Sequence, residues 1–359
     1  MNILNIIGNH INDGNGIGRL IPEMVLMHNN LSDGINSKIL TIQKCEGSEQ
    51  IINYKDIANY STFFSGFDLI IFHGVFFIEY IKISKILKNN KIPYLVKPHS
   101  SLMVEGLKKS WIKKKLASYL FFKRFVNNSN GIIYTNNDEK LNSVLWNESF
   151  FIEPNGIKTE LLFNGRNRKF KEKRRFIYLS RIDFNHKGTD ILLDAIKYLK
   201  DINVIEQIEL DIYGRGNAKE EKKLINIISA LNCDNIKFKG PVFGENKNIA
   251  FSKSDIFILT SRYEGFPMVL LESLYAGLPC IVTPGTNMKH IVSEHNVGWL
   301  VDGNYKAIAN KILDVLAEPN EKLKSISVNG IEYVKNHHDW TNVVSISEKI
   351  YKEVIKGKE

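Results

Sequence analysis

The sequence predicts an α/β protein built from two doubly wound, Rossmann-like domains that face each other across a cleft. Three observations lead to this prediction. The chain has 359 residues, a length that favours two domains over one. In both halves, short isoleucine-rich runs alternate with longer amphipathic stretches, which is typical of βαβ units with a mostly parallel sheet. Between the halves, Gly165–Arg175 is polar, strongly basic and without apolar periodicity, as a linker should be.

The expected first domain spans residues 1–165. Its first run, Asn2–Gly8, has the apolar character of a buried strand, and a glycine-rich loop and a helix over about Ile17–Asn29 follow it. Further strands are expected at Lys38–Ile42, Leu69–Phe72, Tyr94–Val96 and Gly131–Thr135. Helices are expected between these strands, near Val75–Lys88, Leu107–Val126 and Asp138–Trp146.

The expected second domain spans residues 166–340, and residues 341–359 contain a last amphipathic helix, about Thr341–Val354. Strands are expected at Phe176–Ser180, Ile208–Tyr213, Ile236–Phe238, Ile256–Leu259 and Cys280–Val282. Helices are expected at Thr189–Leu199, Lys219–Leu231, Met268–Ala276, Tyr305–Leu316 and Asn320–Lys335. Because ligands of such domains bind at the carboxyl ends of the strands, the cleft between the domains is the expected site.

Composition excludes several classes of protein. Hydrophobic residues make up 43% and charged residues 24% of the chain, which are ordinary globular values. The three cysteines, Cys45, Cys233 and Cys280, are far apart, which excludes a disulfide framework and a cysteine zinc site and suits a reducing cytoplasm. Charged and polar residues interrupt the longest apolar stretch, Phe67–Ile81, so no membrane-spanning helix is expected. The net charge of +9 favours anionic partners.

Two loops of the first half are candidate sites. Gly14–Arg19 follows the first strand, so its backbone is either an ordinary tight turn or a contact for a phosphate or sugar. The loop does not match a nicotinamide fingerprint, because Arg19 stands where glycine is required. Pro98 ends a later strand and presents His99 at the carboxyl edge of the sheet, where His99 either caps the next helix or belongs to the site.

The second half holds stronger candidates. Arg181 and Lys187 lie on the loop after its first strand and form either a diphosphate site or a solvated basic loop. Glu264 and Glu272 flank a Gly-x-Pro turn after an apolar strand. A carboxylate that follows apolar residues, as Glu272 does, needs an ion-pair partner or ligand hydroxyls, and a sugar or ribose would supply the latter.

A basic and aromatic segment suggests a membrane contact. One expected helix carries Lys108, Lys109, Lys113, Lys114, Lys115, Lys123 and Arg124 together with Trp111, Tyr119, Phe121, Phe122 and Phe125. This mixture favours docking on an anionic bilayer, although a solvated face opposite a core face would look similar. No nucleic-acid-binding signature accompanies the charge, so nucleic acid is not an expected partner.

With these residues identified, the sequence resembles the retaining glycosyltransferases of family 4, which have the GT-B fold. The segment SRYEGFPMVLLESLYAGLPCIVT matches the family's E-x7-E motif closely, and Arg181 with Lys187-Gly188 resembles its phosphate-binding pair. Weaker similarities lie at Pro98-His99, at Glu153–Ile157 and at the G-x-G loop Ile212–Gly216. Since the motifs also agree in order, the resemblance covers nearly all of the chain.

The resemblance implies roles for these residues. Glu264 would contact the donor sugar together with the amides beside Gly265 and Phe266, while Glu272 would bind the ribose. Arg181 and Lys187 would hold the diphosphate, and Gly214 would line the donor site. From the first domain, His99 would lie beside the transferred sugar, and Gly16 and Ile17 would approach the phosphate. The last helix, which starts near Trp340, would pack back toward the first domain.

Three positions depart from the family pattern. Ser100 replaces the common glycine after His99. The spacing from Arg181 to Lys187 is one residue longer than usual. Gly285–Lys289 replaces a Gly-Gly-x-x-Glu segment, so a donor contact of the missing glutamate is not expected.

Taken together, the sequence predicts a cytoplasmic glycosyltransferase at the inner face of the cell membrane. It would use a nucleotide-diphosphate sugar, with UDP as the expected nucleotide, retain the anomeric configuration and need no metal or other cofactor. The expected acceptor is a lipid-linked oligosaccharide or growing surface polysaccharide. Two alternatives remain, a hydrolysing nucleotide-sugar 2-epimerase and a non-catalytic module that binds nucleotide or membrane.

Overall fold

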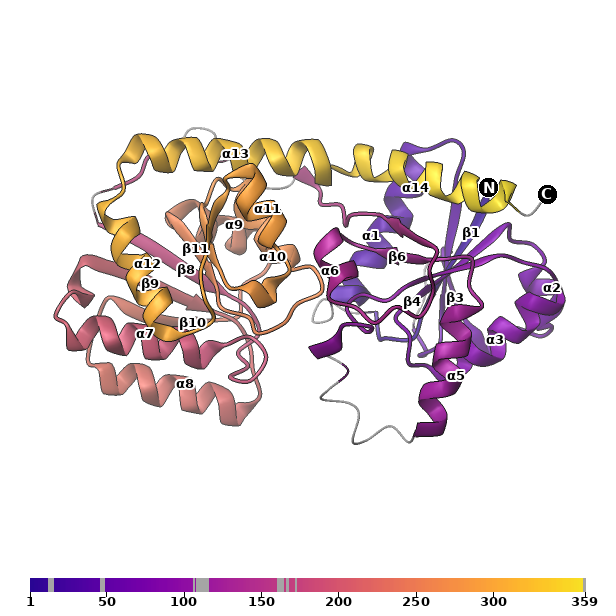
Figure 1. The fold of residues 1–359 in the computed structure, drawn as a ribbon, viewed down its shortest axis with the longest axis horizontal. Coiled ribbons are helices and arrows are strands. Elements are labelled where there is room, and N and C mark those ends of the chain that lie inside the picture. The colour runs from indigo at the N-terminus through magenta and orange to yellow at the C-terminus, as the bar shows by residue number, and fades with distance from the viewer. Residues whose placement is uncertain are drawn as a thin grey trace. The chain divides into compact units, whose positions relative to one another are not determined.

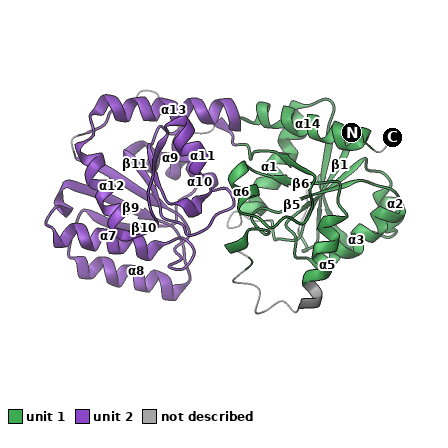
Figure 2. Ribbon diagram, in the orientation of Figure 1, with its two compact units in different colours: residues 1–156, 339–359 green, residues 157–338 purple. Residues whose placement is uncertain are grey.

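The structure, a computed structural model, describes residues 1–11, 16–45, 49–105, 107, 116–159, 165, 168–171 and 173–357, with the backbone alone at 116–118. The chain forms two compact units (Figure 2). Unit 1 contains residues 1–156 and 339–359, and unit 2 contains residues 157–338. The expected boundaries lay at 165/166 and 340/341. The backbone N–H of Ile157 donates to the carbonyl of His338 at 2.9 Å, so unit 2 begins and ends at paired segments.

Unit 1 is built on a parallel sheet whose central strands are buried on both faces. In the described residues its seven strands have the order β3-β2-β1-β4-β5-β6-β7. Strands β1 and β4 are apolar almost throughout because helices cover both faces of such a sheet. The strands are β1 (Asn2–Ile7), β2 (Asn36–Thr41), β3 (Ile51–Asn53), β4 (Leu69–His73), β5 (Tyr94–Lys97), β6 (Ile132–Tyr134) and β7 (Phe150–Ile152).

Helices of unit 1 come from both ends of the chain (Figure 1). They are α1 (Gly16–Leu31), α2 (Tyr60–Phe64), α3 (Ile78–Asn89), α5 (Leu116–Asn127), α6 (Asn137–Leu141) and the last helix, α14 (Trp340–Lys356). Helix α14 packs on α1: the Trp340 indole donates to Glu23 at 2.8 Å and the Ser32 hydroxyl donates to Glu348 at 2.9 Å. The C-terminal helix is therefore part of unit 1.

Unit 2 repeats the plan with a second parallel sheet. Its six strands have the order β10-β9-β8-β11-β12-β13 within the described part of the chain. They are β8 (Arg174–Leu179), β9 (Ile208–Tyr213), β10 (Ile236–Gly240), β11 (Ile256–Leu259), β12 (Cys280–Val282) and β13 (Gly298–Leu300). The helices are α7 (Thr189–Asp201), α8 (Ala218–Leu231), α9 (Gly244–Lys253), α10 (Met268–Tyr275), α11 (Lys289–His295), α12 (Tyr305–Ala317) and α13 (Asn320–His338).

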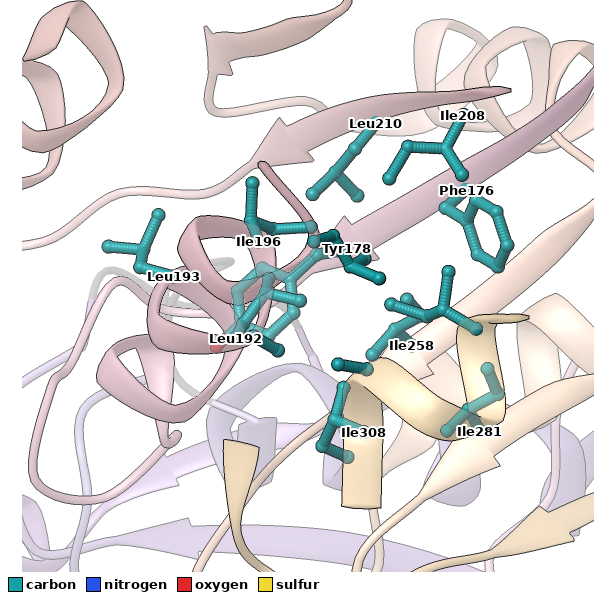
Figure 3. Packing of buried hydrophobic residues seen from close by; sticks show 14 of the residues in the cluster. Phe176, Tyr178, Leu192, Leu193, Ile196, Ile208, Leu210, Ile258, Ile281 and Ile308 are labelled. Atoms are coloured by element: carbon teal, nitrogen blue, oxygen red, sulfur yellow. The ribbon is translucent and has the colours of Figure 1, made fainter. Parts of the chain in front are cut away.

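The core of unit 2 forms where helices pack on the middle of the sheet. Figure 3 shows Leu192 and Ile196 of α7 beside Tyr178 of β8, with Ile308 of α12 nearby, and all four are fully buried. Fully buried aliphatic side chains such as those of Leu192, Ile196 and Ile308 each contribute about 1.5–3 kcal/mol through burial. This core holds the carboxyl ends of β8 and β11 in fixed positions.

These sheets confirm the predicted fold class of two doubly wound α/β units. Several short elements were not expected from the sequence, namely β3, β7, β13, α2, α9 and α11. Two expected helices are shorter than predicted: α3 starts only at Ile78, and α6 ends at Leu141 rather than near Trp146. The expected helix Leu107–Val126 is described only from Leu116, as α5, and most of the basic residues that motivated the membrane prediction lie outside the described residues.

Candidate functional site

The loops after β8 and β11 bring Lys187 and Glu264 into direct contact. The Lys187 ammonium lies 2.5 Å from Glu264 Oε1, and the Ser261 hydroxyl donates to the same oxygen at 2.6 Å. Lys187 keeps 17% of its side chain exposed and Glu264 keeps 9%. Two residues that the sequence placed separately, one for diphosphate and one for sugar, therefore form a single ion pair that is partly open to solvent.

The backbone of Lys187 is held from below. Its carbonyl accepts from the Tyr178 hydroxyl at 3.1 Å and from the Thr260 hydroxyl at 3.2 Å. The next residue, Gly188, has φ of 65°, and a Cβ there would lie 2.1 Å from the Thr260 carbonyl oxygen. Only glycine fits this position, which explains the Lys-Gly pair at the start of α7.

Arg181 does not contact Lys187 or Glu264 in the structure. Its guanidinium donates to Asp183 at 3.0 Å and to Nδ1 of His186 at 2.7 Å, and 59% of its side chain is exposed. His186 Nε2 lies 2.7 Å from the Tyr263 carbonyl, which can only accept, so Nε2 carries the proton. Burial and the Lys187 charge lower the pKa of His186, which agrees with a neutral ring between Arg181 and Tyr263.

Arg262 connects the loop after β8 with the loop after β11. The Arg262 guanidinium makes two bonds to the Asp190 carboxylate, at 2.8 and 2.6 Å, and a third to the Phe184 carbonyl at 2.7 Å. Bidentate pairing of this kind adds geometric specificity. Arg262 therefore fixes the loop that carries Lys187 against the loop that carries Glu264.

The Gly-x-Pro turn leads into α10 as the sequence suggested. The backbone N–H groups of Gly265 and Phe266 make no hydrogen bond to any residue that the structure describes. These amides lie just before Pro267, the residue that caps α10. Free N–H groups near the start of a helix can bind a negatively charged or hydroxyl oxygen.

Asn287 supports this turn and was missed by the sequence reasoning. It is buried, has φ of 56°, and its side-chain amide donates to the Glu264 carbonyl at 2.5 Å. It lies in the Gly285–Lys289 segment, where a difference from the E-x7-E family's pattern was noted in the sequence. In this chain the segment holds the Glu264–Gly265 backbone through an amide side chain.

Glu272 is buried in α10 and is paired with a residue that the sequence did not single out. The Lys247 ammonium of α9 lies 2.6 Å from Glu272 Oε1, and the two side chains are 7% and 10% exposed. A buried carboxylate is expected to have a partner, and in the structure the partner of Glu272 is a lysine.

Gly214 lies after β9, where a Cβ would come within 1.8 Å of the Ser180 carbonyl oxygen, so a larger residue cannot occupy it.

In unit 1, His99 lies on a strained turn after β5. His99 and Ser100 have φ of 47° and 67°, a region that residues other than glycine rarely adopt. The buried Glu139 carboxylate holds the turn, because it accepts from the Ser100 N–H at 2.6 Å and from the Thr135 N–H at 2.8 Å. The hydrogen bonds to Glu139 therefore stabilise the strained backbone of His99 and Ser100.

The His99 ring contacts a second histidine. Its Nε2 lies 2.9 Å from Nδ1 of His73, the last residue of β4, and the two rings are stacked. Gly16 and Ile17 form the first turn of α1. Nearby, Lys97 forms a fully buried ion pair with Glu153 at 2.6 Å.

Comparison with known proteins identifies the family. Residues 162–340, about half of the chain, match the family model described as "Glycosyl transferases group 1". An uncharacterized glycosyltransferase of Methanocaldococcus jannaschii is 27% identical over 318 residues, which cover 87% of this chain and 83% of that protein. The UDP-Gal:alpha-D-GlcNAc-diphosphoundecaprenol alpha-1,3-galactosyltransferase of Escherichia coli is 26% identical over 202 residues, 51% of this chain and 50% of that protein.

A solved structure shows the same fold. The UDP complex of Anabaena HepE has a TM-score of 0.77 at 16% identity, and the match covers 99% of this chain and 100% of that chain. Both units of the present structure are included in this match, which supports the GT-B fold. The family model, the glycosyltransferase relatives and the shared fold together show that the chain belongs to the group 1 glycosyl transferases.

Proposed function

We propose that this glycosyltransferase moves a sugar from a UDP-sugar to a lipid-linked oligosaccharide or growing surface polysaccharide, with retention of the anomeric configuration and without a metal. The observation that carries the proposal is that unit 2 contains two carboxylate–lysine pairs, Lys187–Glu264 and Lys247–Glu272. Carboxylates can bind sugar and ribose hydroxyls, and Lys187, whose side chain is 17% exposed, can bind phosphate. The UDP bound to Anabaena HepE and the diphosphoundecaprenol acceptor in the E. coli relative's name support the two substrates.

An incoming diphosphate would rearrange the Lys187–Glu264 pair. Phosphate oxygens offer the Lys187 ammonium a new anionic partner, and this leaves Glu264 free to accept from a sugar hydroxyl. Arg181 is the more exposed cation, and its guanidinium has five N–H donors, so it can add a phosphate contact while it keeps Asp183 and His186. Until the donor arrives, the ion pair compensates the two charges and keeps the side chains oriented.

Charge on the leaving diphosphate would be stabilised by these cations and by amides. As the glycosidic bond breaks, negative charge grows on the phosphate, and Lys187, Arg181 and the free N–H groups of Gly265 and Phe266 are suited to stabilise it. The leaving phosphate would help to deprotonate the acceptor hydroxyl on the same face, which retains the configuration. His99 of unit 1 would contact the transferred sugar, and Gly16 and Ile17 would approach the phosphate.

Incubation with a panel of radiolabelled UDP-sugars, with and without a lipid extract, tests the proposal. We expect label to pass to the lipid fraction, in EDTA as well as in buffer, with the starting anomeric configuration in the product. Free sugar released without acceptor would instead indicate the hydrolysing 2-epimerase, and UDP binding without turnover would indicate a non-catalytic module. Strict dependence on Mg²⁺ or Mn²⁺ would overturn the metal-free part alone.

Substitutions separate the assigned roles. Lys187→Ala is expected to lower kcat by about 10²–10³, the typical loss for a donor to developing charge. Glu272→Ala is expected to weaken the binding of free UDP, because the ribose is common to UDP and the donor, whereas Glu264→Ala is expected to spare it. Calorimetric titration with UDP measures both, and equal losses of affinity would show that the two roles are wrongly assigned.

Unit 1 is the proposed membrane side, at the inner face of the cell membrane. On α5, Leu120 and Phe121 are 63% and 60% exposed beside the exposed cations Lys123 and Arg124. A cavity of about 500 Å³ next to them is lined by Lys85, Lys88, Lys91, Arg124 and Phe121, among others. Exposed apolar side chains among cations suit an anionic bilayer, to which each cation contributes about 1 kcal/mol. In the described residues, no helix is both long enough and apolar enough to cross a bilayer.

Sedimentation with phosphatidylglycerol-containing vesicles tests the membrane proposal. Replacing Lys85, Lys88 and Lys91 with Gln is expected to weaken vesicle binding about 100-fold, because three cations are lost. The matched control replaces Lys219, Lys222 and Lys324, exposed lysines of unit 2, and it should leave vesicle binding nearly unchanged. Equal effects of the two triple variants would show that net charge alone drives the association, and no binding by the parent would refute the proposal.

A further inference from the structure

A chain of hydrogen bonds runs from β2 through β1 and β4 to His99 in unit 1. The Asn5 side-chain amide donates to the Ser37 hydroxyl at 2.8 Å and approaches the Lys38 carbonyl at 3.4 Å. Asn5 Oδ1 lies 2.9 Å from Nε2 of His73, and His73 Nδ1 lies 2.9 Å from Nε2 of His99. Ser37, Asn5 and His73 are fully buried, so water does not compete for these bonds.

The order of donors and acceptors follows from the ends of this chain. The Lys38 carbonyl can only accept, so the NH₂ group of Asn5 faces β2 and its carbonyl oxygen faces His73. His73 Nε2 must therefore donate, and in a neutral ring Nδ1 then accepts. The proton between the two histidines belongs to His99 Nε2, which leaves His99 Nδ1 with a lone pair.

Both rings are held in the neutral form by their surroundings. Burial and the neighbouring His99 ring lower the pKa of His73 far below its ordinary value, and burial and the charge of Lys97 lower the pKa of His99 to about 3. The strand register places His73 beside Lys97, and Glu139 holds the adjacent Ser100 N–H rather than the ring. Among the described residues, none makes a hydrogen bond to His99 Nδ1, and the ring is only partly buried.

We propose that His73 and Asn5 are positioning residues that hold His99 in the Nε2–H tautomer, so that its Nδ1 accepts a hydrogen bond from a hydroxyl of the transferred sugar. This inference rests on the proposed function in assigning the sugar to His99. It makes His99 a neutral acceptor that recognises a hydroxyl and keeps its own proton. A group that can only accept hydrogen bonds is rejected at this position, because it would face a lone pair.

The tautomer is read directly in the ligand-free, full-length protein by ¹⁵N NMR of labelled histidines. His99 is assigned by the signals that disappear in His99→Gln. We expect a protonated, pyrrole-type Nε2 and an unprotonated, pyridine-type Nδ1 at neutral pH. A protonated Nδ1 would overturn the inference whatever the activity, whereas absence of turnover with every UDP-sugar would count against the proposed function alone.

Variants of His73 test whether the chain sets this state. His73→Leu removes the acceptor, so His99 is expected to populate the Nδ1–H form and kcat/KM for the UDP-sugar donor to fall about tenfold, the value of one hydrogen bond. His73→Asn keeps an acceptor at the Nδ1 position and is expected to retain the parent tautomer and most of the activity. Unchanged ¹⁵N shifts and kinetics in His73→Leu would overturn the inference.

Tyr80→Phe is the matched control. The Tyr80 hydroxyl donates to the backbone carbonyl of His73 at 2.9 Å and to that of Ile6 at 3.1 Å, so it supports the same strands without touching the rings. This variant is expected to lose stability while it keeps the His99 tautomer and kcat/KM. If His73→Leu does not fold, Asn5→Leu is used in its place. Loss of the Asn5 acceptor lets His73 carry its proton on Nδ1, which then donates to His99 Nε2. An equal loss of kcat/KM in Tyr80→Phe and the disrupting variant would reduce the chain to a structural role.

Discussion

Unit 1 and unit 2 both place polar side chains where the strands of a parallel sheet end, but they treat charge in different ways. In unit 1 the His73 and His99 rings have lowered pKa values, and the neighbouring cation Lys97 is paired with Glu153 in the interior, at 2% and 1% exposure. In unit 2 the pair lies at the site itself, where Lys187 and Glu264 are 17% and 9% exposed. Unit 1 therefore buries the ion pair beside its site, whereas unit 2 leaves the Lys187–Glu264 pair partly exposed to solvent.

The difference agrees with the ligands that we propose for each site. A fully buried pair cannot exchange partners, because separating its charges in the interior leaves both without solvation. A partly exposed pair can exchange, since water and a ligand reach it. Unit 2 is therefore suited to an ionic ligand such as a diphosphate, and unit 1 to a neutral one such as a sugar hydroxyl. Lys247–Glu272, at 7% and 10% exposure, is intermediate.

The largest expected effect tests where Lys247–Glu272 belongs in this comparison. Lys247→Ala leaves the Glu272 carboxylate buried without its cation and is expected to lower the free energy of unfolding of unit 2 by about 3–5 kcal/mol. Urea denaturation measures this loss. The double replacement Lys247→Met and Glu272→Met should recover most of it, because an apolar pair of similar size carries no desolvation penalty. A loss below about 1 kcal/mol in Lys247→Ala would place this pair with the exposed ones.

A smaller expected effect concerns His28 of α1. It tests whether the interior of unit 1 keeps an imidazole ring uncharged. This ring is fully buried, neither ring nitrogen has a hydrogen-bond partner among the described residues, and burial lowers its pKa to about 4. The unfolded chain, with a pKa near 6.5, binds a proton that the folded chain does not, so stability falls as pH drops from about 6.5 to about 4, by up to about 3 kcal/mol.

Replacing His28 with Leu should therefore flatten the pH dependence of stability. We expect the difference between the Tm values at pH about 7 and about 4.5 to shrink, since the imidazole that must stay neutral is gone. His290→Leu in unit 2, where the side chain is 47% exposed, is the control and should leave that difference unchanged. Parallel pH profiles for His28→Leu and the parent would show that other groups dominate the acid loss.

The same contrast explains which site residues could be predicted from the sequence. Lys187 and Glu264 stand on loops directly after apolar strands, and the carboxyl edge of a parallel sheet must bring such loops together. Lys247 was missed because α9, GENKNIAFSK, is rich in polar residues and shows little apolar periodicity. Its contact with Glu272 depends on packing between elements that are distant in sequence.

The hydrogen-bonded chain Ser37–Asn5–His73–His99 of unit 1 was also not predicted, although the sequence contains an indication of it. Asn5 and His73 each interrupt or end an otherwise apolar, buried strand. Most buried polar side chains have a hydrogen-bond partner, so two of them on adjacent strands indicate that they bond to each other. The fold class could be predicted well, because strand and helix periodicities repeat along the chain. The short strands β3, β7 and β13 could not, because three residues are too few for a pattern.

The smallest expected effect concerns Ser100, the residue that follows His99 on the turn after β5. The structure gives Ser100 a φ of 67°, in the region where glycine has no steric penalty. Ser100→Gly should therefore relieve backbone strain and raise the free energy of unfolding of unit 1 by about 1 kcal/mol, less whatever the hydrogen bond from the Ser100 hydroxyl to the His99 carbonyl contributes. Because the Glu139 bond is to the Ser100 backbone N–H, it remains in the variant and His99 should keep its position. Thermal denaturation and the ¹⁵N shifts of His99 measure the two expectations. A loss of stability would show that Ser100 stabilises the turn through its side chain, and a changed His99 tautomer would show that the strained turn, as well as His73, orients the ring.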